Sequence, residues 1–323
     1  MHLHCQGLDV SSRASLKHML CAAVLTGCAL LTGGCWNGRI LFAMEEPSWA
    51  AGAGDVLLRR PLVRASLLHG YFPGFLLIRT QEDPVARLRR ELTVRRYGVA
   101  VVGPLLSLDP QLFTAAPPST RLLLVEGASA ATPPGNAVRL VFDRREAFRI
   151  AGSAAGLAVG QQAGGTVTSA LAARVGVLVS MHPPGTQEEL SAFMAGVAQT
   201  LDGGQPSLRT ISDPVDRNAI QVAIGQMRRD GVEIFLLFLG APDSWALETL
   251  KNTGGSAVVS DWAASRADSA QVFLSVETDL AGGVARFLTH AQSVEGVVSG
   301  PVRIVAGKAL PVPSEVATQV SPR

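Results

Sequence analysis

Apolar, β-branched runs alternate with segments of helical period along most of this chain, and this alternation constrains the fold more than any other feature. It is typical of βαβ units, in which helices join parallel strands and cover the sheet. The apolar residues of the runs are nearly continuous, which indicates strands buried on both faces. The predicted strands are residues 39–44, 75–79, 99–104, 121–125, 137–142, 174–181, 207–211, 232–239, 257–260 and 272–276. The predicted fold class is therefore α/β with mostly parallel sheets.

Two segments show clear helical spacing of their apolar residues. They are Leu190, Phe193, Val197 and Leu201, and Ile220, Ala223, Ile224 and Met227. Three Asp-Pro steps, at Asp83, Asp109 and Asp213, are predicted to begin helices, because Asp accepts hydrogen bonds from free N–H groups and Pro suits the first turn. The arginine-rich helix after Asp83 keeps its leucines on one side, which predicts a solvated outer face, with a basic docking patch as the alternative.

A length of 323 residues permits two lobes that share a hinge. We expect a signal peptide over residues 1–27 and a first lobe over 28–143 with a return segment at about 256–285. The second lobe is predicted over 144–255 and 286–312, and a tail over 313–323. The first crossing between the lobes is placed near residues 143–164.

The cysteines occur only near the N-terminus, at positions 5, 21, 28 and 35, which argues against a disulfide framework. Arg13 and Lys17 precede a short apolar run, in the charged-then-apolar order of a secretory signal. The tetrapeptide that ends at Cys28 resembles the bacterial lipobox, and Cys35 is the second choice for the acylated residue. We therefore expect a lipoprotein anchored to a membrane, with its body in the cell envelope outside the cytoplasm.

Composition and motifs argue against several other functions. A formal net charge of +2 and few aromatic residues give no reason to expect nucleic acid as a partner. Past the signal, only His69, His182 and His290 remain, without metal-ligand spacing, and no phosphate-binding loop motif occurs. We therefore predict a protein that is not an enzyme and needs no metal or cofactor.

The order of motifs resembles the basic membrane protein family of substrate-binding lipoproteins. The resemblance runs from about residue 39 to 311 and is clearest in residues 146–156, an acidic-aromatic helix rich in Ala and Gly, followed by the strand at 174–181. It implies a type I periplasmic-binding-protein fold, with two doubly wound lobes and a ligand between them. It also implies a role in ABC-type uptake, with a permease as partner and a nucleoside-like or other small polar ligand.

Ligands of parallel sheets bind beyond the carboxyl ends of the strands, so the candidate ligand-binding residues follow predicted strands. They are Glu45, Trp49, Asp213, Gly240, Asp261, Trp262 and Glu277. A nucleoside would need an aromatic face, from Trp49 or Trp262, and a hydrogen-bond acceptor such as Asp261. The alternatives are helix caps for Asp213 and Asp261 and a packing role for Trp262.

Two departures from the family pattern affect the predicted ligand. Residues 45–49 replace an Asp-rich loop, and residues 275–279 lack a lysine that the family carries in the cleft. The alternative function is a degenerate binding-protein fold that serves as a structural or adhesive envelope lipoprotein. Convergence of Trp49, Asp261 and Trp262 on one pocket would favour solute binding.

Overall fold

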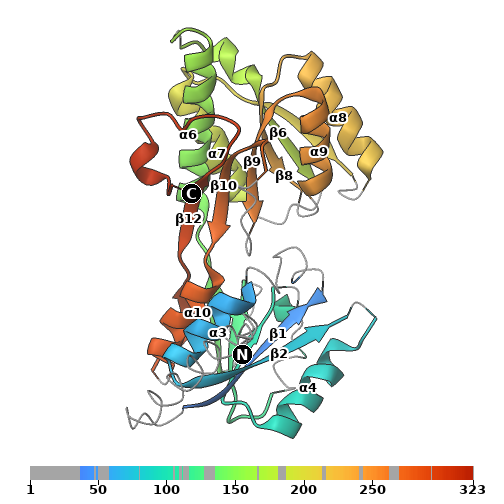
Figure 1. The fold of residues 1–323 in the computed structure, drawn as a ribbon, viewed down its shortest axis with the longest axis vertical. Helices are drawn as coiled ribbons and strands as arrows, with labels where there is room; N and C mark the ends of the chain where they lie inside the picture. The colour runs from blue at the N-terminus through green and yellow to red at the C-terminus, as the bar shows by residue number, and fades with distance from the viewer. Residues whose placement is uncertain are drawn as a thin grey trace, which may run out of the picture.

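In the part of the chain that the structure describes, twelve strands form two six-stranded sheets, one in each of two α/β lobes that lie end to end along the long axis (Figure 1). The computed structural model describes residues 37–46, 49, 58–79, 81–104, 106–108, 111, 116–126, 135–165, 167–180, 187–212, 216–239, 243–261, 269–291 and 293–322. Cys28 and Cys35 lie outside this part of the chain. Within it, no helix has both the length and the apolar character needed to cross a bilayer.

The sheet of the first lobe has the strand order β11-β5-β4-β3-β1-β2, and all its pairs are parallel. Successive residues of a strand point to opposite faces, so Phe42 packs with helices on one side of the sheet and Leu41 on the other. Helices α3 (Arg59–Leu68) and α10 (Leu280–Thr289) cover the first face, and α4 (Pro84–Arg95) covers the second. The strands are β1 (Gly38–Glu45), β2 (Tyr71–Ile78), β3 (Val99–Val102), β4 (Arg121–Val125), β5 (Ala137–Val141) and β11 (Gly296–Ser299).

The second sheet has the order β12-β10-β9-β8-β6-β7, in which only the β10–β12 pair is antiparallel. Helices α6 (Arg145–Gln162) and α7 (Gln187–Thr200) cover one face, and α8 (Arg217–Arg229) and α9 (Asp243–Thr253) cover the other. The strands are β6 (Val175–Ser180), β7 (Ser207–Ile211), β8 (Ile234–Phe238), β9 (Ser256–Asp261), β10 (Val272–Thr278) and β12 (Val302–Ala306). The predicted two-lobed α/β fold is therefore confirmed.

The chain crosses between the lobes three times, after β5, after β10 and between β11 and β12. The predicted domain limits differ from this topology. β9 and β10 belong to the second sheet, so the return to the first lobe covers residues 279–299 rather than 256–285. Residues 313–323 are not a free tail over their described part, because Val316 and Val320 are buried in the core of the second lobe.

Helix starts agree with the predictions in part. Asp83 caps α4 by accepting hydrogen bonds from the N–H groups of Val85 and Ala86, and Pro84 occupies the first turn. The same assignment is wrong for Asp213, because α8 begins at Arg217 and its cap is Asp216. Strand β2 begins four residues earlier than predicted, since an edge strand tolerates a proline such as Pro73.

Candidate functional site

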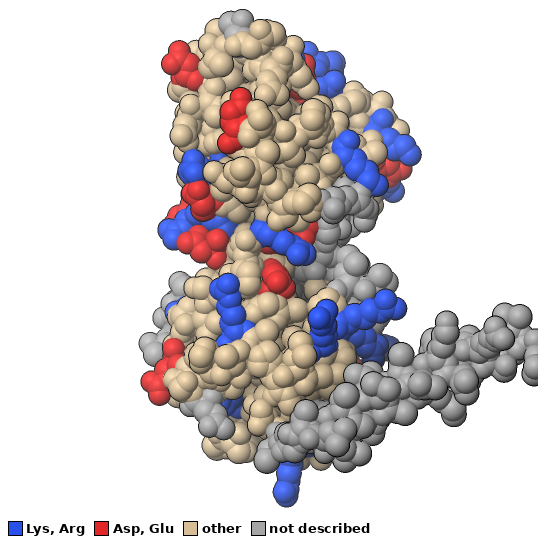
Figure 2. Space-filling view, turned by 60° about the vertical axis from the view of Figure 1, so that its left-hand side comes forward, with Lys and Arg blue, Asp and Glu red and all other residues tan. Residues whose placement is uncertain are grey.

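The carboxyl ends of the parallel strands in the two sheets face each other. The arrowheads of β1 in the first lobe and β9 in the second point into the space between the lobes (Figure 1). The molecule narrows there, and acidic and basic side chains lie on both sides of the narrow part (Figure 2). This is the region where open parallel sheets bind their ligands.

Glu45 is the last residue of β1 and is buried, with 7% of its surface exposed. One carboxylate oxygen accepts a hydrogen bond from the backbone N–H of Leu106. The other, Oε2, has no hydrogen-bond partner among the described residues. Gly103, just after β3, lies so close that an added Cβ would stand 2.5 Å from Oε2. A buried carboxylate oxygen without a hydrogen-bond partner in the described part of the chain therefore lies at the strand ends of the first lobe, packed against Gly103.

The second lobe presents a matching carboxylate at the end of β10. Glu277 is 3% exposed, and its Oε2 accepts from Arg303 of β12 at 3.2 Å and 3.3 Å. Its Oε1 has no partner in the described part of the chain, and the same holds for the buried hydroxyls of Ser275, Thr278 and Ser180. Ser180, Glu277 and Thr278 lie at strand ends, whereas Ser275 lies in the middle of β10. Unpaired buried polar groups cost free energy, so several of them at one sheet edge are typical of a site completed by water or a ligand.

Arg144 joins the two lobes at the first crossing. Its guanidinium lies 3.3 Å from Glu126, which follows β4 in the first lobe, and 2.9 Å from Glu189 of α7 in the second. Burial raises the pKa of the Glu126 carboxyl, with Arg144 opposing the shift and Glu189 adding to it. No local sequence pattern indicates this cluster, because its two carboxylates are far from Arg144 in the chain and neither belongs to a motif.

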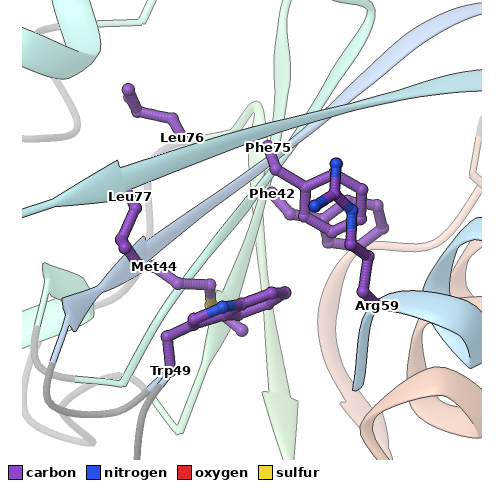
Figure 3. A pocket seen from close by; sticks show the side chains of 7 residues that line it. All are labelled: Phe42, Met44, Trp49, Arg59, Phe75, Leu76 and Leu77. Carbon is purple, nitrogen blue, oxygen red and sulfur yellow. The ribbon is translucent and has the colours of Figure 1, made fainter. Parts of the chain in front are cut away.

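Trp49 packs into the first lobe rather than standing free. It is 8% exposed and its ring lies 5.7 Å from that of Phe75, centroid to centroid. Both rings line a pocket of about 220 Å³ together with Phe42, which stacks on Phe75, and Arg59, whose guanidinium lies 5.1 Å from the Phe75 ring centroid (Figure 3). The remaining lining residues are Met44, Leu76 and Leu77.

Asp261 is the last residue of β9 and pairs with Glu277 in the sheet register. Asp213, Gly240 and Trp262 lie outside the described residues. The structure thus places Asp261 at the same sheet edge as Glu277, and Glu45 on the facing lobe. Convergence of Trp49, Asp261 and Trp262 on one pocket stays a prediction.

Within the described part of the chain, no group of three His, Cys, Asp or Glu side chains is arranged to hold a metal ion. The buried groups at the two edges are carboxylates and hydroxyls, which donate to or accept from polar ligands. Each of the two edges thus carries groups that form hydrogen bonds with polar solutes.

A scan against protein-family models matched none, and a search of curated proteins found no match. Solved structures do resemble this chain. An ABC transporter solute-binding protein from Conexibacter woesei superposes with a TM-score of 0.64 at 13% identity, over 87% of this chain and 93% of that one. A transcriptional activator of the comK gene from Bacillus halodurans gives a TM-score of 0.63 at 16% identity, over 87% and 94%.

A solute-binding protein from Agrobacterium vitis, bound with α-D-tagatopyranose, gives a TM-score of 0.57 at 13% identity, over 87% of this chain and 99% of that one. At such identities the likeness concerns the fold. The chain has the type I periplasmic-binding-protein fold.

Proposed function

We propose that this protein is a lipid-anchored solute-binding protein of a bacterial ABC-type uptake system and that it holds a small polar ligand between its lobes. The observation that carries the proposal is the pair of buried carboxylates, Glu45 and Glu277, at the facing strand ends of the two lobes. Each has one oxygen without a partner among the described residues. The family resemblance and the named solute-binding neighbours support the same function.

The chemistry of these groups favours a ligand with several hydrogen-bond donors. Ionised carboxylates only accept hydrogen bonds, whereas the hydroxyls of Ser180 and Thr278 both donate and accept. Sugars and nucleosides present hydroxyls of this kind, and a nucleoside also needs an aromatic face. Trp262 is our candidate for that face, since the ring of Trp49 already packs against Phe75.

The three chain segments that cross between the lobes would act as a hinge, so we propose that the lobes close on the ligand. A ligand held by Glu45 on one side and by Glu277 and Asp261 on the other stabilises a closed state, because it binds that state more tightly than an open one. We propose that the permease recognises the closed form. Arg144, which pairs with a carboxylate of each lobe, lies at the hinge of this motion.

The experiment is a thermal-shift screen of the purified protein with sugars, nucleosides and amino acids. A ligand that binds only the folded state raises the melting temperature in proportion to the logarithm of its concentration. Loss of a charged acceptor or a stacking aromatic lowers affinity roughly ten- to a hundredfold. We expect this for Glu277→Gln, Asp261→Ala and Trp262→Ala, but not for the exposed control Glu315→Gln.

Absence of a shift with any class would favour the alternative, a structural or adhesive envelope lipoprotein that no longer binds solutes. The anchor is tested separately by intact mass of the mature protein. We expect an acylated N-terminus at Cys28. A lipid on a chain that begins at Cys35 would move the assignment to the second cysteine.

A further inference from the structure

Four exposed apolar side chains lie at the amino edge of the first sheet, on the two turns that follow α3 and α4, and these helices cover opposite faces of the sheet. Leu67 and Leu68 end α3, Phe72 is the second residue of β2, and Val94 lies in the last turn of α4. Their exposed fractions are 46%, 74%, 47% and 71%. These residues, called the outer turn surface below, lie at the amino edge of the first sheet, away from the carboxyl edge that holds Glu45.

Both turns form hydrogen bonds with the start of β1. Asn37 donates its backbone N–H to Gly70 and its side-chain amide to His69, each at 2.8 Å, which ties it to the turn after α3. Gly98, after the end of α4, donates to the carbonyl of Arg39 at 3.0 Å, and the Arg39 guanidinium lies over the Tyr97 ring. The described chain therefore enters the lobe between these two turns.

The distance from Asn37 to the predicted anchor is short. Asn37 is the ninth residue after Cys28 and the second after Cys35. An extended chain spans at most about 3.5 Å per residue, which allows about 32 Å from Cys28 and about 7 Å from Cys35. A lipid on either cysteine would hold the amino edge of the first sheet near the bilayer.

Exposed arginines accompany the apolar side chains. Arg64 precedes Leu68 by one helical turn, Arg39 is the second residue of β1, and Arg95 and Arg96 follow Val94. The nearest carboxylate on these turns, Glu91, pairs with Arg95. Arginine stems lie along apolar surface while their charged ends reach phosphate, which is the arrangement of proteins that rest on anionic membranes.

We propose that the outer turn surface seats on the phospholipid bilayer that carries the lipid anchor. Leu67, Leu68 and Val94 enter the interfacial layer, and the arginines contact lipid phosphates. The proposal rests on the anchor in the proposed function. β1 then leads away from the membrane for about 23 Å before it reaches Glu45, so the first lobe is held and the second is free to close on it.

The test uses the acylated full-length protein in vesicles of phosphatidylethanolamine and phosphatidylglycerol, with a fraction of dibrominated phosphatidylcholine that quenches nearby tryptophan. Leu68→Trp places a fluorophore on the outer turn surface. Leu208→Trp is the matched control, because Leu208 is a 49% exposed leucine on β7 of the second lobe. We expect brominated lipid to remove about half or more of the emission added at position 68 and little of that added at 208.

Adding Leu67→Glu to Leu68→Trp should reduce this quenching at least twofold, and so should replacing phosphatidylglycerol by phosphatidylcholine in the Leu68→Trp protein. Equal, weak quenching at positions 68 and 208 in an acylated protein would overturn the docking surface and leave the anchor standing. A blue-shifted emission at 68 that depends on protein concentration and not on brominated lipid would assign the surface to a second copy of the chain. A mature protein without an acyl group would overturn both the anchor and the docking, whereas solute binding is scored independently by thermal shift.

Discussion

The two lobes share one strand order but pack their helices in different ways. The strand orders match position by position, and each sheet is covered by helices on both faces. In the first lobe, α3 and α10 meet through large side chains, among them Leu62, Val284 and Phe287. In the second, the contact between α6 and α7 includes a glycine on each helix, Gly152 and Gly196.

Glycines set the spacing of α6 and α7. A Cβ added to Gly152 would overlap the carbonyl oxygen of Phe193, and one added to Gly196 would overlap that of Arg149. The two backbones are therefore in direct contact. One sheet topology thus accepts either interlocking side chains or close backbone approach, and the two solutions differ in the kind of substitution that they tolerate.

The largest expected effect is that of Gly196→Val. The new side chain has no room beside the backbone of α6, so we expect a loss of at least about 4 kcal/mol in the free energy of unfolding, or no folded protein. Urea unfolding measures it. The matched control is Gly225→Ala on α8, where a Cβ meets open space, and it should stabilise by about 0.5–1 kcal/mol. A small effect of Gly196→Val on the free energy of unfolding would contradict this, because it would show that α6 and α7 can move apart to admit a side chain.

The second-largest effect is expected from Arg144→Ala, which should lower the free energy of unfolding by about 3 kcal/mol. The substitution leaves Glu126 and Glu189, one from each lobe, without their shared cation in a buried setting. Arg145→Ala is the neighbouring control, because Arg145 is 57% exposed and pairs with exposed carboxylates. Equal effects of the two substitutions on urea unfolding would mean that the contact between the lobes at Arg144 contributes no more than a surface ion pair.

Most strands could be predicted from the sequence, because continuous apolar residues report burial on both faces without knowledge of the partners. β4 and β7 have the predicted limits. β11 and β12 were missed, since β11 is a four-residue edge strand with mostly exposed side chains and β12 has only two buried positions. These two strands carry the last crossing, so their absence from the prediction explains the wrong end of the return segment. Its wrong start has another cause, the assignment of β9 and β10 to the first lobe.

Only the location of the candidate residues in the sheets could be predicted from the sequence. Ligands of parallel sheets bind beyond the carboxyl ends of the strands, and this places Glu45, Asp261 and Glu277 at carboxyl edges, where the structure has them. Burial of the two glutamates and the link through Arg144 depend on contacts between distant segments, which no local pattern reports. For the same reason, packing of Trp49 against Phe75 was not foreseen.

A smaller effect is expected from Glu126→Gln, as a change in pH dependence. Burial raises the pKa of Glu126 above its ordinary 4.5, so the folded state binds this proton more tightly than the unfolded state does. Glu126 therefore contributes its full stabilisation below its ordinary pKa, and this contribution is lost as the pH rises through the raised pKa of the folded state. Gln has no such titration, so the variant should gain stability relative to wild type between acidic and neutral pH. Thermal melts at a series of pH values measure this, with the 70% exposed Glu188→Gln as control. A constant difference across the series would contradict it.

The smallest expected effects compare one cap in each lobe. Asp83 accepts from two backbone N–H groups at the start of α4, at 2.9 Å and 3.1 Å, and Asp216 does the same at the start of α8, at the same distances. Replacing either by Ala should cost about 1 kcal/mol, because two helix N–H groups lose their acceptor. The pair shows whether the lobes unfold together. If the three crossings and Arg144 make the two lobes one cooperative unit, each substitution lowers the temperature of the same calorimetric transition. The loss in free energy of the double variant is then the sum of the two single losses. If the lobes unfold separately, Asp83→Ala shifts one transition and Asp216→Ala shifts the other, and the packing of α6 against α7 would then govern the second lobe alone.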